Sequence, residues 1–280
     1  MIDLHVHSSA SDGSFTPEEV AAKGRDFALM ALTDHDSTEG VARFLAESRR
    51  LGVTTPRLVG VEMGIEPGKG YDKFHLLGLG FDLGNEPLQA LMRELRAIRD
   101  DRNRRLFVKL AELGMPVTEE DVQKHVTGVV VGKPHFAHAL VDRGWVACCQ
   151  DAFDYIFGHG CPADIPHPYV ASELAIERIH AAGGLAVMAH PFQWTEDPQL
   201  LRDGLVRLKD AGLDGIEAHY HDFSAAQRQH LVSLARDLDL LITAGSDFHG
   251  TNKPTIPLGM EVDDEAAFVG KVVERLMCVV

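Results

Sequence analysis

Histidine and carboxylate side chains recur in short clusters along this sequence of 280 residues. The first cluster is the stretch DLHVHS at 3–8, and Asp12 follows it in a polar segment. Side chains of a strand alternate between its two faces, so His5 and His7 would point the same way and could hold one metal ion. A buried strand can also carry such a pair as ordinary hydrogen-bonded histidines, and Asp12 could equally be a turn residue. This cluster alone therefore leaves both interpretations open.

Further polar residues interrupt or follow apolar runs later in the chain. The stretch TDHD at 33–36 comes directly after the apolar run 28–32, and polar residues there are costly unless they are paired or ligated. Glu62 lies within the apolar stretch VGVEM, where a carboxylate is rarely structural without a partner. His75 and His190 each lie within or after an apolar run, where a satisfied core histidine is the ordinary explanation. A second alternating pair, Asp247 and His249, follows the last apolar run.

These clusters share one position: nearly every one lies at the C-terminal end of a predicted strand. Parallel barrels keep their active sites at that end. Structural histidines that arose independently would be scattered over many faces and positions. The coincidence predicts a metal site built from the following nine residues: His5, His7, Asp12, His35, Glu62, His75, His190, Asp247 and His249. Histidine and carboxylate ligands without cysteine favour Mn²⁺, with Fe²⁺ or Zn²⁺ as alternatives.

The elements expected to position these residues are short apolar strands that alternate with amphipathic helices. Such alternation is typical of βα units and a parallel sheet. The predicted strands are 2–7, 29–34, 58–63, 74–79, 185–189, 215–219 and 240–244, which favours a closed or slightly distorted α/β barrel. Thr16, Pro17 and Glu19 form a capping signature that starts a helix. Between 86 and 160 the alternation gives way to helical patterns, so we expect a barrel of residues 1–85 and 161–280 with a helical insertion domain over its active end.

Composition excludes several classes of function. The net charge of −15 argues against broad adhesion to nucleic acid or anionic membranes. No apolar run approaches the roughly 20 residues that span a bilayer, and the start of the chain does not resemble a signal peptide. The four cysteines form no CxxC pair, so we expect reduced thiols, no disulfide partner and a cytoplasmic protein.

Taken together, the motifs DLHVHS, TDHD, the strand glutamate, the strand histidine, AHP and GSDFH resemble those of the PHP (polymerase and histidinol phosphatase) family. The resemblance spans nearly the whole chain outside the insertion. It implies a distorted (β/α)₇ barrel of the PHP and amidohydrolase-like type with a trinuclear metal centre, so we expect two to three ions per chain.

The resemblance also implies a role for each candidate ligand. His5, His7, Glu62 and Asp247 would hold the first ion, and Asp12, His35 and His249 the second. Glu62 would bridge to a third ion that His75 and His190 also hold. Asp12 stands where some relatives have histidine. Glu62 takes the bridging place that a carboxylated lysine fills in related amidohydrolases.

The expected chemistry is hydrolysis of a phosphate monoester by a metal-bridging hydroxide. Neighbouring divalent ions acidify water and neutralise phosphoryl oxygens, which this slow reaction requires. Asp12, His35, Asp247 and His249 are therefore predicted to be catalytic as well as ligating. His219, at the end of the sixth predicted strand, and His221, just after it, are candidates for the acid that protonates the leaving oxygen, and a surface role is an equally ordinary explanation for them.

The insertion carries positive charge in an acidic protein. Arginines are dense between 93 and 105, and some of them would only form ion pairs on a solvated helix face. The predicted substrate-binding residues are Arg99, Arg102, Asn103, Lys133 and His135, the last two near a helix start that could hold a phosphate.

This helix and the stretch GKPHFAHALVDRG are similar to one bacterial PHP subgroup, phosphatases of nucleoside 3′,5′-bisphosphates with related 5′-to-3′ exoribonuclease activity on short RNA. The resemblance implies removal of the 5′-phosphate from a substrate such as adenosine 3′,5′-bisphosphate. A histidinol-phosphate or other small-metabolite phosphatase, or a non-catalytic metal-binding PHP module, are the alternatives.

Overall fold

A computed structural model describes residues 1–66, 74–158, 160–165 and 168–279. Its centre is a sheet of eight strands in the order β1-β2-β3-β4-β6-β7-β8, with β5 paired to β3. The strands are β1 (Ile2–Asp3), β2 (Leu29–Leu32), β3 (Arg57–Glu66), β4 (Phe74–Leu79), β5 (Val170–Ala171), β6 (Leu185–Met188), β7 (Gly215–Tyr220) and β8 (Leu241–Gly245).

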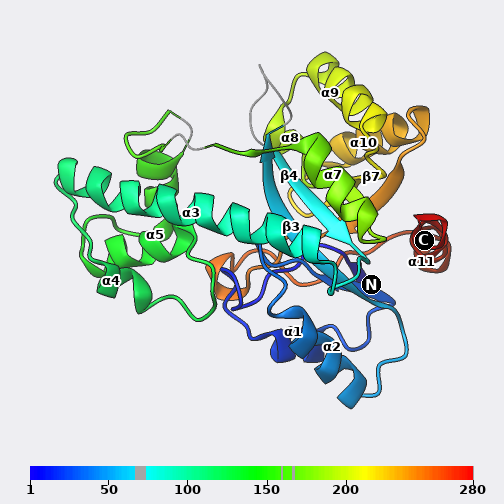
Figure 1. Ribbon diagram of the computed structural model, residues 1–280, viewed down its shortest axis with the longest axis horizontal. Coiled ribbons are helices and arrows are strands. Elements are labelled where there is room, and N and C mark those ends of the chain that lie inside the picture. The colour runs from blue at the N-terminus through cyan, green and yellow to red at the C-terminus, as the bar shows by residue number, and fades with distance from the viewer. Residues whose placement is uncertain (67–73, 159, 166–167, 280) are drawn as a thin grey trace.

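The sheet curls into a nearly closed barrel (Figure 1). The amide of Leu4 donates to the carbonyl of Ala244 at 2.9 Å, and Val6 forms a parallel bridge with Phe248. These contacts bring the first and last strands together. The predicted α/β barrel is confirmed, although the first strand is shorter than expected and ends before His5.

Helices cover the outside of the barrel, as the alternating pattern predicts. They are α1 (Pro17–Lys23), α2 (Val41–Arg50), α7 (Ser172–Ala181), α8 (Pro191–Trp194), α9 (Pro198–Asp210), α10 (Ala225–Asp237), the 3-10 turn η2 (Gly250–Asn252) and α11 (Glu265–Val279). The capping box predicted for α1 is present, with Thr16 and Glu19 each bonding the other's backbone amide. Local sequence signals therefore locate the start of this helix correctly.

The expectation of an all-parallel sheet is wrong at β4, which pairs antiparallel with both β3 and β6. Only residues 67–73 separate β3 from β4, and a parallel return needs a crossover of a dozen or more residues. The reversal has a functional consequence. His75 lies at the start of β4, opposite Gly64, and so reaches the same end of the barrel as the C-terminal residues of the other strands.

Residues 86–160, which we call the cap, form helices joined by turns and loops where described. Their helices are α3 (Glu86–Glu112), α4 (Glu119–Gln123), α5 (Lys133–Asp142), α6 (Cys149–Ala152) and the π-helix η1 (Phe153–Phe157). Leu106, Leu110, Phe136 and Leu140 belong to a buried cluster separate from the barrel core, whereas Leu88 near the start of α3 packs in the barrel core. Helix α3 thus joins the two regions (Figure 1). The division into two domains at 86 and 160 stays a prediction.

Candidate metal centre

The structure gathers all nine predicted ligands at one end of the barrel. His5 and His7 follow β1, His35 follows β2, His190 follows β6, and Asp247 and His249 follow β8. Their convergence follows from the parallel strands, whose carboxyl ends meet at one rim. We call the nine residues the candidate metal cluster.

Glu62 on β3 is the centre of this cluster. Its carboxylate is buried, and histidine nitrogens lie 2.7–3.2 Å from its oxygens. These nitrogens belong to His5, His7, His35, His75 and His190. A buried carboxylate in contact with so many histidines is well placed to bridge ions.

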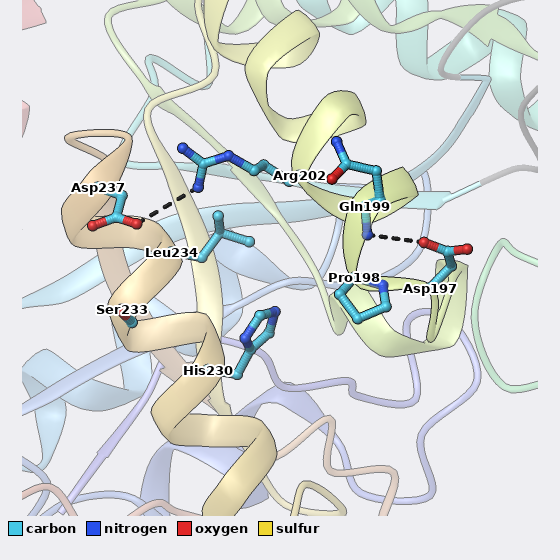
Figure 2. A pocket seen from close by; sticks show the side chains of 8 residues that line it. All are labelled: Asp197, Pro198, Gln199, Arg202, His230, Ser233, Leu234 and Asp237. Atoms are coloured by element: carbon cyan, nitrogen blue, oxygen red, sulfur yellow. Dashed lines mark hydrogen bonds and ion pairs between the residues drawn. The ribbon is translucent and has the colours of Figure 1, made fainter.

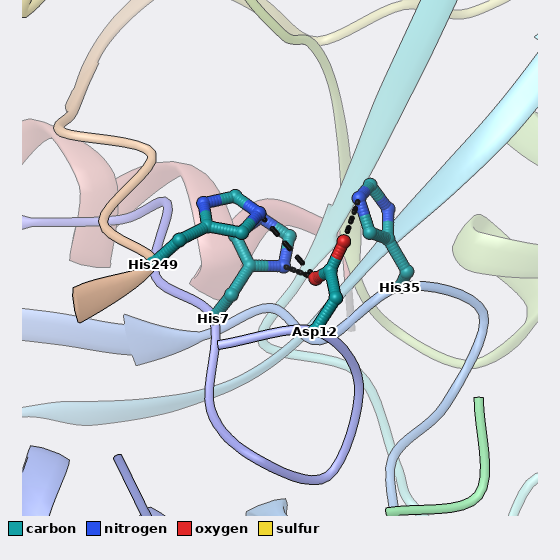
Figure 3. Close-up of side chains that lie close together, drawn as sticks. All are labelled: His7, Asp12, His35 and His249. Atoms are coloured by element: carbon teal, nitrogen blue, oxygen red, sulfur yellow. Dashed lines mark ion pairs between the residues drawn. The ribbon is translucent and has the colours of Figure 1, made fainter. Parts of the chain in front are cut away.

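Asp12 forms a second group with three histidines (Figure 3). Its carboxylate oxygens lie 3.7 Å from nitrogens of His7 and His35 and 3.4 Å from His249 Nε2. The donor atoms of this group all lie within 4.8 Å of one another, as do those of His5, His7 and Asp247 and those of His5, Glu62 and His190. The polar stretch after His7 therefore brings Asp12 into the cluster.

Buried polar atoms in the cluster test whether metal ions fit. Among the described residues, His5 Nε2, both ring nitrogens of His7, His35 Nδ1 and Glu62 Oε2 are buried and make no hydrogen bond. Carboxylate oxygens face these nitrogens at 3.0–3.7 Å. Buried polar atoms without partners are costly, and a cation between the nitrogens and carboxylates would satisfy them. The donor set therefore fits divalent ions.

The charges of the cluster lead to the same conclusion. Burial opposes ionisation of Glu62, but the histidines around it hold the pKa of its carboxyl well below its usual range. Burial likewise opposes ionisation of Asp12 and Asp247, but His35 and His249 keep the pKa of Asp12 low, and Lys253 followed by His249 keeps the pKa of Asp247 low. Burial also opposes protonation of His7, yet the carboxylates of Asp247 and Glu62 raise its pKa to about 9. Ionised carboxylates gathered in a buried site attract cations, which would replace the histidine protons.

Residues behind the cluster fix the orientation of its side chains. Glu217 on β7 accepts hydrogen bonds from His5 Nδ1 at 3.1 Å and from the His190 amide at 2.8 Å. The bond to His5 Nδ1 leaves Nε2 of that ring facing Glu62 and Asp247. Supporting bonds of this kind set the tautomer and direction of metal-binding histidines.

Asp247 is held in a similar way. Tyr220 and Lys253 both bond its Oδ2, at 2.9 Å and 2.6 Å, so that Oδ1 faces His5, His7 and His249. The sequence motifs do not point to Glu217, Tyr220 or Lys253. Their only sequence signal is Glu217 inside the apolar strand GIEAHY, comparable with Glu62 in β3.

Backbone strain also concentrates here. Among the described residues, four that are not glycine have positive φ, and three of these adjoin or belong to the cluster: Asp36, His190 and Asp247. Such conformations cost roughly 1–3 kcal/mol each and persist where the surrounding structure imposes them. The hydrogen bonds of Glu217 to His190 and of Lys253 to Asp247 supply part of that constraint.

The predicted substrate-binding residues lie in the cap beside the cluster, but several already have partners. Arg99 bonds Asp36 Oδ2 at 2.5–3.0 Å, and Lys133 donates to the carbonyl of Phe157 at 2.7 Å. His135 accepts from the Gly132 amide at 2.9 Å, within its own helix start. Arg99 and Arg102 line a cavity of about 60 Å³ that His75, Asp36 and Tyr169 also line. The lining of this cavity thus includes cap residues and one member of the cluster, His75.

The structure does not bring the two predicted leaving-group acids into the cluster. His219 lines a surface hollow with residues of α10 and α11. A bulge in β7 between Glu217 and His219 interrupts the alternation of the strand, so the two side chains do not point the same way. His221 bonds its neighbour Asp222 at 3.1 Å. Tyr220, which lies between them, is the residue that points into the site, because the bulge shifts the alternation of the strand.

A hollow of about 470 Å³ also lies between α9 and α10 (Figure 2). Arg202 and Asp237 form an ion pair at 3.5 Å between these two helices, and the described lining residues include none of the candidate ligands. This hollow is therefore separate from the candidate metal cluster.

No described helix of the protein is both long and apolar enough to pass through a bilayer.

Comparison with known proteins agrees with this geometry. The PHP domain family model matches residues 3–162. The chain is 34% identical to a 3′,5′-nucleoside bisphosphate phosphatase of Chromobacterium violaceum, over 89% of this chain and 87% of that protein. It is 33% identical to a 5′-3′ exoribonuclease of Haemophilus influenzae, over 88% of this chain and 89% of that protein.

A solved structure shows the same fold. It is described as a metal-dependent phosphoesterase of Bifidobacterium adolescentis, and it matches with a TM-score of 0.85 at 30% identity, over 99% of this chain and 96% of that one. The chain therefore belongs to the PHP family and is a metal-dependent phosphoesterase.

Proposed function

We propose that this protein removes the 5′-phosphate from nucleoside 3′,5′-bisphosphates, with adenosine 3′,5′-bisphosphate as the best candidate. The candidate metal cluster would hold two to three divalent ions, with Mn²⁺ favoured. His5, His7, Glu62 and Asp247 would hold one ion, and Asp12, His35 and His249 another. His75 and His190 would share a third with Glu62. When bound, such ions acidify water and neutralise phosphoryl oxygens.

The chain's own residues orient the ligand side chains of this site. Glu217 keeps the Nε2 of His5 directed at the cluster, and Tyr220 and Lys253 keep Asp247 Oδ1 directed at it. Ligand atoms that are already fixed in direction need no reorganisation during the reaction, and such preorganisation is a main source of catalytic power in enzymes. Lys253 also places a positive charge at the rim of the cluster, where the anionic substrate would enter.

One observation carries the choice of a substrate with a second phosphate. Arg102 is buried beside the cavity that His75 also lines, and its described partners include no carboxylate within ion-pair distance. Burial, followed by the neighbouring charge of Arg99, lowers the pKa of Arg102 to about 9. A buried guanidinium in this state would gain from binding an anion. The cluster can process one phosphoryl group, so a second phosphoryl group on the substrate would account for the buried charge of Arg102.

The second phosphate would serve as a handle. Held mainly by Arg102, it would orient the 5′-phosphate over the cluster and so contribute to kcat as well as to affinity. The first internucleotide phosphate of a short RNA offers the same anion at the same distance from the 5′ end. Some 5′-to-3′ exonuclease activity on 5′-phosphorylated RNA should accompany the phosphatase. The relatives named for a nucleoside bisphosphate and for RNA support both activities.

The test compares kcat/KM of the Mn²⁺-loaded protein for adenosine 3′,5′-bisphosphate, 5′-AMP and histidinol phosphate. We expect the bisphosphate to be preferred over 5′-AMP by about 10-fold or more, the value of one charge-assisted contact. Equal values for these two would remove the handle. A preference for histidinol phosphate would favour a small-metabolite phosphatase instead.

A further inference from the structure

Asp12 differs from the other candidate ligands because it lies on a loop and not at a strand end. The loop runs from Ser8 to Ser14, and the Gly13 amide closes it by bonding the carbonyl of Ser8 at 2.9 Å. At its tip the Asp12 carboxylate reaches the histidines of the cluster. A loop ligand is only as well placed as the contacts that hold the loop.

A segment of the cap runs against this loop. Thr127 Oγ1 donates to the carbonyl of Ser9 at 3.0 Å, and the Val129 amide donates to the carbonyl of Ala10 at 3.3 Å. Between them, Gly128 approaches so closely that an added Cβ would lie 2.3 Å from the carbonyl oxygen of Ala10. The two backbones are therefore in direct contact, and only glycine fits at 128.

Asn252 connects the same loop to the cap from the other side. Its Nδ2 donates to the carbonyl of Asp12 at 2.8 Å, and its Oδ1 lies 3.3 Å from Nε2 of His138 on α5. The other nitrogen of that ring, Nδ1, lies 3.4 Å from Cys149 Sγ. An Nε2–H tautomer of His138 would satisfy both contacts, with the thiol as donor to Nδ1. The bridge thus runs from the cap through Asn252 to the backbone of Asp12.

We propose that Asn252 and Gly128 are positioning residues for Asp12, so that the ion assigned to Asp12, His35 and His249 binds tightly only while the cap is docked on the barrel. The cap then contributes to metal binding as well as to substrate binding. The inference rests on the ligand assignment made under the proposed function. It does not depend on which phosphate ester is hydrolysed.

Two substitutions loosen the contact from opposite sides. Asn252→Ala removes the bridge to the Asp12 carbonyl, and Gly128→Ala pushes the cap segment away from Ala10. The matched controls are Asn85→Ala and Gly270→Ala. Asn85 is also a half-buried asparagine that donates to a backbone carbonyl, that of Ala181 at 3.1 Å. It accepts from the Leu88 amide as the N-cap of α3, so Asn85→Ala also controls for a loss of stability. A Cβ at Gly270 meets nothing within 4 Å.

The readout is Mn²⁺ bound per chain, measured by equilibrium dialysis and elemental analysis over a range of free Mn²⁺, with phosphate release measured in parallel. We expect both test variants to bind one ion about tenfold more weakly, the lower end of what loss of a supporting contact costs. The remaining ions should bind as in the wild type, and excess Mn²⁺ should restore phosphate release. Both controls should bind Mn²⁺ as the wild type does.

Wild-type Mn²⁺ binding by both test variants would overturn the inference, as would an equal loss in the controls or a wild-type protein that binds no Mn²⁺. If Asn252→Ala does not fold, Gly128→Ala gives the decision alone. Should the variants show the expected weakening while the loaded wild type hydrolyses no nucleoside bisphosphate, the proposed function fails and the inference stands.

Discussion

The candidate metal cluster and the cations of the cap differ in how their polar atoms are partnered. In the cluster, described nitrogens of His5 and His7 are buried without hydrogen bonds. In the cap, Arg99 is bonded to Asp36 and Lys133 to the carbonyl of Phe157. The cluster is thus incomplete without cations, whereas most of the cap's charge already holds the fold together.

This difference separates residues that serve function from residues that serve structure. An arginine or lysine near an active site is not available to substrate merely because it is near. Arg102 is the exception in the cap, since it is buried and its described bonds go to the neutral side chain of Asn103. We therefore propose that catalysis belongs to the cluster and substrate affinity mainly to Arg102.

The largest effect should come from the cluster. Asp247→Asn keeps the shape of the side chain but removes a charge that faces three histidines, and we expect kcat to fall by roughly 10³-fold, the upper end for loss of one stabilising group. Steady-state phosphate release measures this, with circular dichroism to show a native fold. Residual activity above one tenth of the wild type would contradict the assignment.

A smaller effect is expected in the cap. Arg102→Met keeps much of the buried volume and removes the cation, so KM for adenosine 3′,5′-bisphosphate should rise about 10- to 100-fold, as expected for a charge-assisted bond of about 1.5–3 kcal/mol. KM for 5′-AMP and the Mn²⁺ content should change little. Lys133→Met is the matched control, because Lys133 already bonds Phe157 and should affect KM less. Equal effects of the two variants would break the distinction between them.

Glu217, behind the cluster, should act by orienting ligands. Assays of kcat and of Mn²⁺ binding can distinguish this role from a part in the chemistry. Glu217→Gln replaces one acceptor oxygen with an NH₂ group. The side chain then cannot accept hydrogen bonds from both His5 Nδ1 and the His190 amide on separate oxygens. We expect Mn²⁺ affinity to fall about tenfold, as for other residues that orient a ligand. Saturating Mn²⁺ should recover most of kcat. A loss of kcat that Mn²⁺ does not recover would place Glu217 in the chemistry instead.

The smallest effect concerns a pair remote from both regions, His180 and Asp214, whose atoms lie 2.7 Å apart. The hydrogen bond to Asp214 raises the pKa of His180 against the opposing effect of burial. The contribution of its charge is therefore complete below about pH 6.5 and is lost as the pH rises through the higher folded pKa.

His180→Asn should accordingly lower the free energy of unfolding by less than about 1 kcal/mol at pH 5.5, and by a smaller amount at pH 9. Urea unfolding at the two pH values measures the difference. A larger loss at pH 9 would contradict the sign of the shift, and any loss of turnover would contradict the separation of this pair from the site.

Which parts of the molecule could be predicted depended on how local their signals are. The strand ends that carry His5, His35 and Asp247 follow from apolar runs that stop at polar residues, so the cluster and the barrel were predictable. The direction of β4 was missed because the pattern of an apolar strand is the same in both orientations. Only the shortness of 67–73 indicates the reversal.

Residues whose role depends on long-range contacts were beyond the sequence. Tyr220 enters the site because a bulge in β7 changes the alternation, and Lys253 reaches Asp247 from a loop. The bond of Arg99 to Asp36 was not predicted either. Neither a bulge nor an ion pair across 63 positions leaves a local pattern.

The central claim, that the cluster is a metal centre, is tested most directly by elemental analysis of the wild-type protein purified in Mn²⁺, beside His35→Ala as the comparison. The unpartnered buried nitrogens and ionised carboxylates predict two to three ions per chain for the wild type and at least one fewer for the variant. A metal content near zero in the folded wild-type protein would contradict the account.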